Sequence, residues 1–123
     1  MSIKSHKDLL VWQKGIKLCK NIYKVTDKFP TSEMYGLSSQ MRRSAVSISS
    51  NIAEGGSRNT TKDFLHFLSI SLGSVSELET QIEISNELSF IDEVQYRDLN
   101  TQLTEISKML VGLIKKLNDK TSH

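Results

Sequence analysis

The stretch EVQYRDLNTQLTEISKMLVGLIKKL, from Glu93 to Leu117, places apolar side chains at alternating steps of three and four residues. This spacing is typical of a helix that buries one face against other helices. The apolar positions are Tyr96, Leu99, Leu103, Ile106, Leu110, Leu113 and Leu117. Asp92 and Gln95 have the spacing of a helix cap and its box partner, so we expect this helix to begin at about residue 93.

The same periodicity predicts three earlier helices, over about residues 61–87, 33–54 and 8–28. Thr60, three residues before Asp63, predicts the cap of the 61–87 helix. We expect Gly55-Gly56 to end the 33–54 helix and Pro30 to end the first one, because the residue before a proline is pushed out of the helical region. The predicted core positions of the two middle helices are Met34, Leu37, Met41, Ala45, Ile48 and Ile52, then Phe64, Leu68, Ser71, Val75, Leu78 and Ile82.

Four helices of similar length, joined by short breaks, predict an all-α fold: an antiparallel up-down-up-down four-helix bundle. The 123 residues suit one domain, over residues 1–123. A single cysteine excludes an internal disulfide framework. No apolar run approaches the ~18 residues that cross a bilayer. The N-terminus has no apolar stretch like that of a signal peptide, so we expect a cytoplasmic protein that does not contact membranes.

The first predicted helix is apolar over more of its surface than a bundle needs. One sector holds Val11, Gly15, Leu18, Ile22 and Val25, and a neighbouring sector holds Trp12, Ile16, Cys19 and Tyr23. Together they cover roughly 180°, whereas a bundle helix buries a stripe of about 100°. The second sector either caps the edge of the bundle or forms an oligomer interface, and we favour the interface because aromatic residues are enriched in interface cores.

The third predicted helix carries a row of small residues opposite its core: Ser69, Gly73, Ser76 and Thr80. Such a row either lets another backbone approach closely or is simply a solvated face. The charge of this region is also distinctive. Residues 59–90 hold one Lys against five acidic residues, whereas residues 1–30 hold seven Lys against two Asp. The two regions can therefore attract each other, within one chain or between subunits.

Lysines recur along the first helix, at Lys7, Lys14, Lys17, Lys20, Lys24 and Lys28. A lysine row is usually a solvated face, but a row of this length can also follow a nucleic-acid backbone. The second helix carries a polar row at steps of three and four: Gln40, Arg43, Ser47, Asn51 and Glu54. We favour a hydrogen-bond network across an interface, with Glu54 pairing Arg43 or Arg58. The alternative is an anion site held by Arg42, Arg43 and Arg58.

Recognisable catalytic and metal-binding patterns are missing from the sequence. The three histidines lack ligand spacing, and Cys19 lies on an apolar sector, where a packed thiol is commoner than a nucleophile. Gly55-Gly56-Ser57-Arg58 lacks the ending of a phosphate-binding loop. We therefore expect no enzymatic activity, no catalytic residue, no metal and no cofactor.

Several motifs together resemble one known family. They are DLLVWQK at 8–14, FP at 29–30, YGL at 35–37, QMRRSAVSI at 40–48, SNIAEG at 50–55 with Arg58, FLHFL at 64–68, GS at 73–74 and EL at 77–78. Over about residues 6–117 the chain resembles the bacterial four-helix bundle family first met as proteins encoded by intervening sequences in 23S rRNA genes. The resemblance implies a ring-shaped homopentamer without known catalytic activity. The related accessory variability determinant proteins of diversity-generating retroelements form similar basic pentamers, which bind nucleic acid and a reverse transcriptase.

We therefore expect an oligomeric, non-enzymatic bundle that binds RNA or DNA as an accessory or scaffold, with a reverse transcriptase as a further possible partner. The alternative is a protein-interaction module that has no nucleic-acid role. The expected nucleic-acid-binding residues are Lys14, Lys17, Lys20, Lys24, Arg42, Arg43 and Arg58. The expected subunit contacts are Trp12, Ile16, Tyr23, Gln40, Asn51, Glu54 and Gly73.

Overall fold

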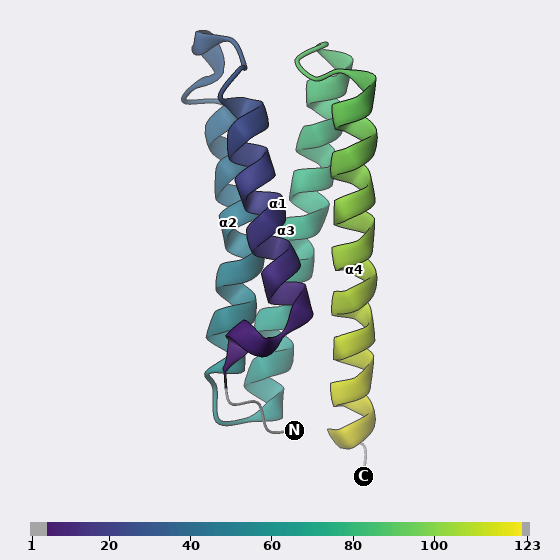
Figure 1. Ribbon diagram of the computed structural model, residues 1–123. Coiled ribbons are helices and arrows are strands. Elements are labelled where there is room, and N and C mark those ends of the chain that lie inside the picture. Colours follow the sequence, from purple (N-terminus) through teal and green to yellow (C-terminus); the bar gives the residue numbers. More distant parts are fainter. Residues whose placement is uncertain (1–4, 122–123) are drawn as a thin grey trace.

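The computed structural model describes residues 5–121, which form four α-helices and two short 3-10 helices with no strand among them. The α-helices are α1 (Leu10–Thr26), α2 (Leu37–Gly56), α3 (Thr61–Glu87) and α4 (Glu93–Thr121), and the 3-10 helices are η1 (His6–Asp8) and η2 (Thr31–Glu33). The predicted all-α fold with four helices is confirmed. The chain turns back after each α-helix, and the first turn of α1 lies at the same end of the molecule as the last turn of α4 (Figure 1). Each helix packs against the next, and α1 also contacts α4.

The caps of α3 and α4 are those that the sequence predicts. Thr60 Oγ1 accepts a hydrogen bond from the Asp63 backbone N–H at 3.1 Å. Asp92 and Gln95 form a reciprocal box, in which each side-chain oxygen accepts from the other residue's backbone N–H at 2.8 and 2.9 Å. These bonds satisfy donors that have no partner in the first turn of a helix. Both helices therefore begin where predicted, while α4 runs four residues beyond its expected end.

The predicted bounds of α2 are wrong at both ends. Residues 31–33 form η2, and the α-helix begins only at Leu37, whose N–H donates to Glu33 Oε1 at 3.3 Å. Met34 therefore lies outside the helical register and is 53% exposed, so its predicted place in the core is also wrong. At the other end the helix continues through Gly55 and Gly56. Gly55 is buried against α3, where a Cβ atom would lie 2.9 Å from Phe64 Cδ1 and from Phe67 Cβ. Its role is close packing rather than helix termination.

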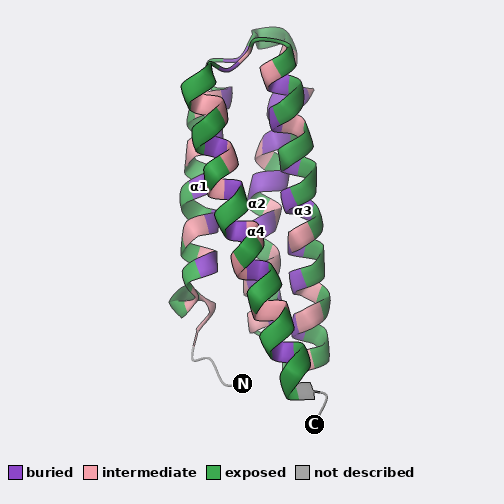
Figure 2. Ribbon diagram, turned by 90° about the vertical axis from the view of Figure 1, so that its right-hand side faces the viewer, coloured by how far each residue is buried: buried purple, intermediate pink, exposed green. Residues whose placement is uncertain are grey.

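The core is a column of aliphatic side chains contributed by all four helices. Its fully buried large side chains are Leu18, Ile22, Met41, Ile48, Ile52, Leu68, Leu78, Ile82, Leu99, Leu103, Ile106 and Leu110. In Figure 2 the buried positions recur along the helices at intervals, as one buried face per helix requires. Ser71, predicted within the stripe of α3, is fully buried, and its hydroxyl donates to the Ile48 carbonyl at 2.8 Å. Tyr96 and Leu113 are only half-buried.

We expect Gly55→Ala to lower the free energy of unfolding by about 1–3 kcal/mol, because the new methyl group overpacks the contact with Phe64. Gly112→Ala is the matched control, since a Cβ at that helical position meets no atom within 4 Å. This control should gain up to about 1 kcal/mol through helix propensity. Urea unfolding followed by circular dichroism measures both values. Equal stability of the two variants would contradict a packing role for Gly55.

Candidate interaction surfaces

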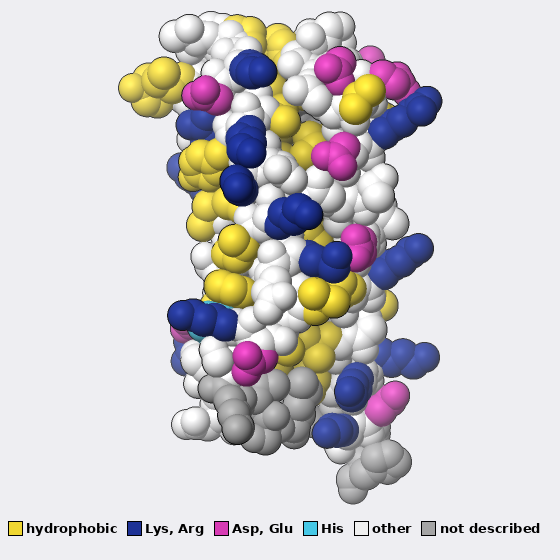
Figure 3. Space-filling model, viewed as in Figure 1, with side chains coloured by type: hydrophobic (Ala, Val, Ile, Leu, Met, Phe, Trp, Pro, Cys, Tyr) yellow, Lys and Arg dark blue, Asp and Glu magenta, His cyan; other side chains and the backbone are white. Residues whose placement is uncertain are grey.

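The lysines of α1 form a basic surface on the outside of the bundle. We define the basic band as Lys17, Lys20, Lys24 and Lys28, all of which are exposed. At 100° per residue the three helical members lie within about 60° of one another around α1. Figure 3 shows Lys and Arg side chains crossing the molecule diagonally over α1 and appearing again at the lower end of α4. Among the described residues, no member of the band forms an ion pair.

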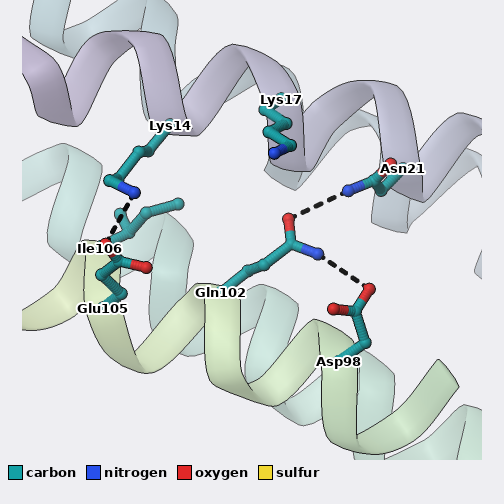
Figure 4. A pocket seen from close by; sticks show the side chains of 7 residues that line it. All are labelled: Lys14, Lys17, Asn21, Asp98, Gln102, Glu105 and Ile106. Carbon is teal, nitrogen blue, oxygen red and sulfur yellow. Dashed lines mark hydrogen bonds and ion pairs between the residues drawn. The ribbon is translucent and has the colours of Figure 1, made fainter. Parts of the chain in front are cut away.

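Lys14 differs from the band because it is held against α4. Its Nζ lies 2.7 Å from Glu105 Oε1, and the pair borders a groove of about 250 Å³ between the two helices (Figure 4). Further along the groove, Gln102 accepts a hydrogen bond from Asn21 and donates one to Asp98, both at 3.0 Å. These contacts make the groove a polar seam that joins α1 to α4. Lys14 therefore has a charge partner within the chain.

The three arginines proposed as an anion site point into different surroundings. Arg42 donates from Nε to Thr26 Oγ1 at 2.9 Å, and its guanidinium lies 4.8 Å from the centre of the Tyr23 ring. Adjacent helical positions point about 100° apart. Arg43 accordingly faces the other way, toward a cleft between α2 and α3. Arg58, past the end of α2, pairs with Glu54. The structure thus does not gather the three guanidinium groups, and of the two alternative partners expected for Glu54 it pairs Arg58 with that residue.

A cleft of about 260 Å³ follows the seam between α2 and α3. It brings together part of the predicted polar row of α2 with polar side chains of α3. The lining residues are Gln40, Arg43, Ser44, Ser47, Ser74, Glu77 and Gln81. Toward one end, Asn51 donates to the Ser47 hydroxyl at 2.9 Å, and this hydroxyl lies 2.8 Å from that of Ser74. Gln81 differs from these residues, because its buried Oε1 atom has no hydrogen-bond partner within the described part of the chain.

An apolar surface lies beside the basic band, where α1 meets α2. We define the apolar column as Trp12, Ile16, Tyr23 and Val46. Ile16 is 46% exposed and Tyr23 is 44% exposed, while Trp12 is half-buried with its ring 5.2 Å from that of His6. Apolar side chains follow this margin of the molecule in Figure 3. The second apolar sector of α1 therefore keeps much of its surface in contact with solvent, and its role as an interface stays a prediction.

The small-residue row of α3 is also on the surface. Ser69, Gly73, Ser76 and Thr80 are all exposed, and a Cβ built at Gly73 would meet no atom within 4 Å. Contacts within the chain therefore do not require a glycine at this position. Two exposed apolar residues, Ile70 and Ile84, lie on the same helix.

Sequence reasoning missed a second group of lysines, in the last turns of α4: Lys108, Lys115, Lys116 and Lys120, all exposed. The total charge of residues 91–123 is zero, which concealed them. Four of the five acidic residues precede Lys108, at Asp92, Glu93, Asp98 and Glu105. The change of sign along the helix would have revealed the basic end. This order also matches the helix dipole, which favours acids at the N-terminus and bases at the C-terminus.

The described residues 5–121 contain no group of three or more His, Cys, Asp or Glu side chains that could hold a metal ion. Within the same range, no helix is long and apolar enough to cross a membrane.

The model of the 23S rRNA-intervening sequence protein family matches residues 7–112. The chain belongs to this family. A crystal structure from the S23 ribosomal protein family, of a Bacteroides thetaiotaomicron protein of unknown function, is similar with a TM-score of 0.80 and 29% identity. The similarity covers 86% of this chain and 96% of that one. No curated protein matches the chain. The predicted family is thus confirmed, and neither the family description nor the Bacteroides structure names an enzymatic activity.

In this 23S rRNA-intervening sequence family member, Cys19 lies half-buried in the hollow between Trp12 and Val46. Burial raises the pKa of its thiol, so less of it is the reactive thiolate at neutral pH. We expect iodoacetamide to alkylate Cys19 several-fold more slowly in the native protein than in urea, as measured by intact-mass spectrometry at about pH 7.5. A native rate equal to or above the unfolded rate would contradict the packed-thiol interpretation.

Proposed function

We propose that this protein is a non-enzymatic, oligomeric bundle that binds RNA or DNA as an accessory or scaffold protein. The observation that carries this proposal is the basic band, which is exposed along α1 and just past its end, together with the further basic side chains that Figure 3 shows at the lower end of α4. Arrays of exposed lysines attract nucleic-acid phosphates and release their counterions. Lysine contacts to phosphates carry no sequence information, so binding is salt-sensitive and weakly specific.

The geometry of the basic band supports contact with several phosphates at once. Lys17 and Lys24 are seven positions apart on α1, which corresponds to about 10.5 Å along the helix axis, and Lys28 lies in the turn beyond the end of the helix. A DNA duplex carries one negative charge per ~1.7 Å of its axis, so many phosphates lie within this span. The band has no ion pairs within the described chain, which leaves its charge available, whereas Lys14 and Arg58 each have an acidic partner.

Self-association would raise the affinity of the protein for a long nucleic acid. We propose that the apolar column is covered by another copy of the chain, in the homopentamer that the family resemblance implies. Each copy then contributes one basic band to the outside of the assembly. Several weak sites on one particle bind a long nucleic acid far more tightly than a single site does.

We expect Lys17→Gln combined with Lys24→Gln to weaken binding to a labelled RNA or duplex DNA, measured by fluorescence anisotropy. If each lysine neutralises one phosphate of B-DNA, the slope of log affinity against log salt should become shallower by about 1.8. Lys62→Gln, which removes one exposed lysine on α3, is the control and should change the affinity less. Circular dichroism checks that each variant keeps the fold.

Absence of binding at about 50 mM salt, with the assembly intact, would reject the nucleic-acid role. The result would then favour the alternative function, that of a protein-interaction module, because the exposed side chains of the apolar column suit a protein partner. Unchanged affinity of the double variant, with binding present in the unmodified chain, would move the contact away from the basic band.

For self-association, we expect light scattering to give a mass several times the 13.9 kDa of one chain. Trp12→Ala should lower this mass, and so should Ile16→Glu. Because the Ile16 side chain is exposed, the glutamate should leave the fold of the monomer intact. Val111→Glu is the control, since Val111 is similarly exposed but lies on α4. A monomer from the unmodified chain would contradict the proposed assembly.

A further inference from the structure

The outward side of α3 has the composition of an unpartnered contact surface. We define the α3 outer face as Ile70, Gly73, Glu77, Thr80 and Ile84, which follow one another at steps of three and four and are all exposed. Residues with this spacing line one side of a helix. Ile70 is 40% exposed and Ile84 is 44% exposed. The face therefore has apolar ends, a small residue that permits close approach and an acid at its centre.

Glu77, at the centre of this face, and Gln81, on its border, are acceptors for which the described residues supply no ion pair or hydrogen bond. Glu77 and Gln81 lie one helical turn apart, and both line the cleft between α2 and α3. Glu77 forms no ion pair within residues 5–121. The Gln81 Oε1 atom is buried without a hydrogen bond among the described residues, so it can accept one from water, from Arg43 in the same cleft or from a donor on another chain. A long basic side chain entering the cleft would supply this donor and neutralise Glu77.

The complementary surface is on α1. Lys20 is exposed and has no ion pair among the described residues. Around the helix it lies about 40° from Ile16 and about 60° from Tyr23, so it borders the apolar column. Ile16 and Tyr23 are seven residues apart, as are Ile70 and Glu77, and Glu77 and Ile84. The two faces therefore share a repeat of about 10.5 Å along their axes.

The net charges of the two regions are also opposite. Residues 1–30 hold seven Lys and two Asp, and residues 59–90 hold one Lys and five acidic residues. Such complementarity orients one surface on another and disfavours pairing of like surfaces. Two copies meeting α1 to α1 or α3 to α3 would bring like charges together.

We propose that the α3 outer face is the docking surface for the apolar column of a second copy, whose Lys20 donates to Glu77 and to the Gln81 amide oxygen. This inference rests on the self-association in the proposed function and specifies which surfaces meet. The contact joins two different faces, so each copy keeps one free face for the next, and the assembly grows until it closes as a ring. Lys17, Lys24 and Lys28 stay free for nucleic acid.

The first test blocks the close approach at Gly73. Gly73→Gln adds a neutral side chain into open space, so the monomer keeps its fold. We expect light scattering at micromolar concentration to show at least a tenfold weaker assembly, with an unchanged helical circular dichroism spectrum at room temperature. Gly112→Gln is the matched control, because it makes the same change at another open helical position and should keep the unmodified mass. Unmodified assembly of Gly73→Gln would overturn the proposal.

The second test exchanges the proposed charge partners. Lys20→Glu and Glu77→Lys should each weaken assembly, because each places like charges opposite one another in the docked pair. Combining both changes in one chain restores opposite charges, so we expect most of the assembly to return. A double variant no better than the worse single variant would overturn the pairing of Lys20 with Glu77.

The third test distinguishes a contact between unlike faces from one between like faces. Ile16→Glu disables the apolar column, and Gly73→Gln disables the α3 outer face, so each chain alone should be monomeric. Mixed together, they should form a 1:1 dimer and nothing larger, since one intact face remains on each. A dimer formed by either variant alone would overturn the proposal. A monomeric unmodified chain would instead refute the assembly in the proposed function, which keeps the two failures apart.

Discussion

The close approach of α2 and α3 is the constraint on which the rest of the bundle depends. Small residues line this seam: the Ser71 hydroxyl donates to the Ile48 carbonyl, the Ser47 and Ser74 hydroxyls are bonded to each other, and Gly55 lies against Phe64. Hydroxyls that reach across to a backbone or to one another cost little inside a core because they are satisfied. The resulting pair of helices is the framework on which α1 and α4 complete the core.

This framework also determines which surfaces remain for partners. Helix α1 buries one stripe against it, and the rest of its circumference carries the apolar column and the basic band. The α3 outer face points away from the core, and the cleft beside it forms where α2 and α3 present polar rather than aliphatic side chains. The protein thus combines an aliphatic interior with outer faces of strongly different character, and the proposed contacts use these outer faces.

Much of this architecture could be predicted from sequence because the features involved are local or periodic. The caps at Thr60 and Asp92 depend on neighbours three residues away, and the core stripes follow from helical spacing. The start of α2 was harder to predict from sequence. Residues 31–33 form the 3-10 helix η2, although their spacing also fits the α-helical repeat. Gly55 appeared to be a terminator because its packing partner lies in the next helix. The separation of Arg42 from Arg43 follows from the helix, whereas the hydrogen bond of Arg42 to Thr26 depends on tertiary packing.

The polar seam between α1 and α4 has a consequence for how the molecule opens. Lys14, Asn21 and their partners join α1 to α4 through contacts near water, and α1 is the shortest α-helix, with 17 residues. Solvent-accessible polar contacts contribute little to cohesion. Hydrogen exchange should therefore find the slowest amides in α2 and α3, with α1 separating as an earlier cooperative unit. Helix α1 carries the basic band and most of the apolar column, so local opening of this one helix would disrupt both surfaces at once.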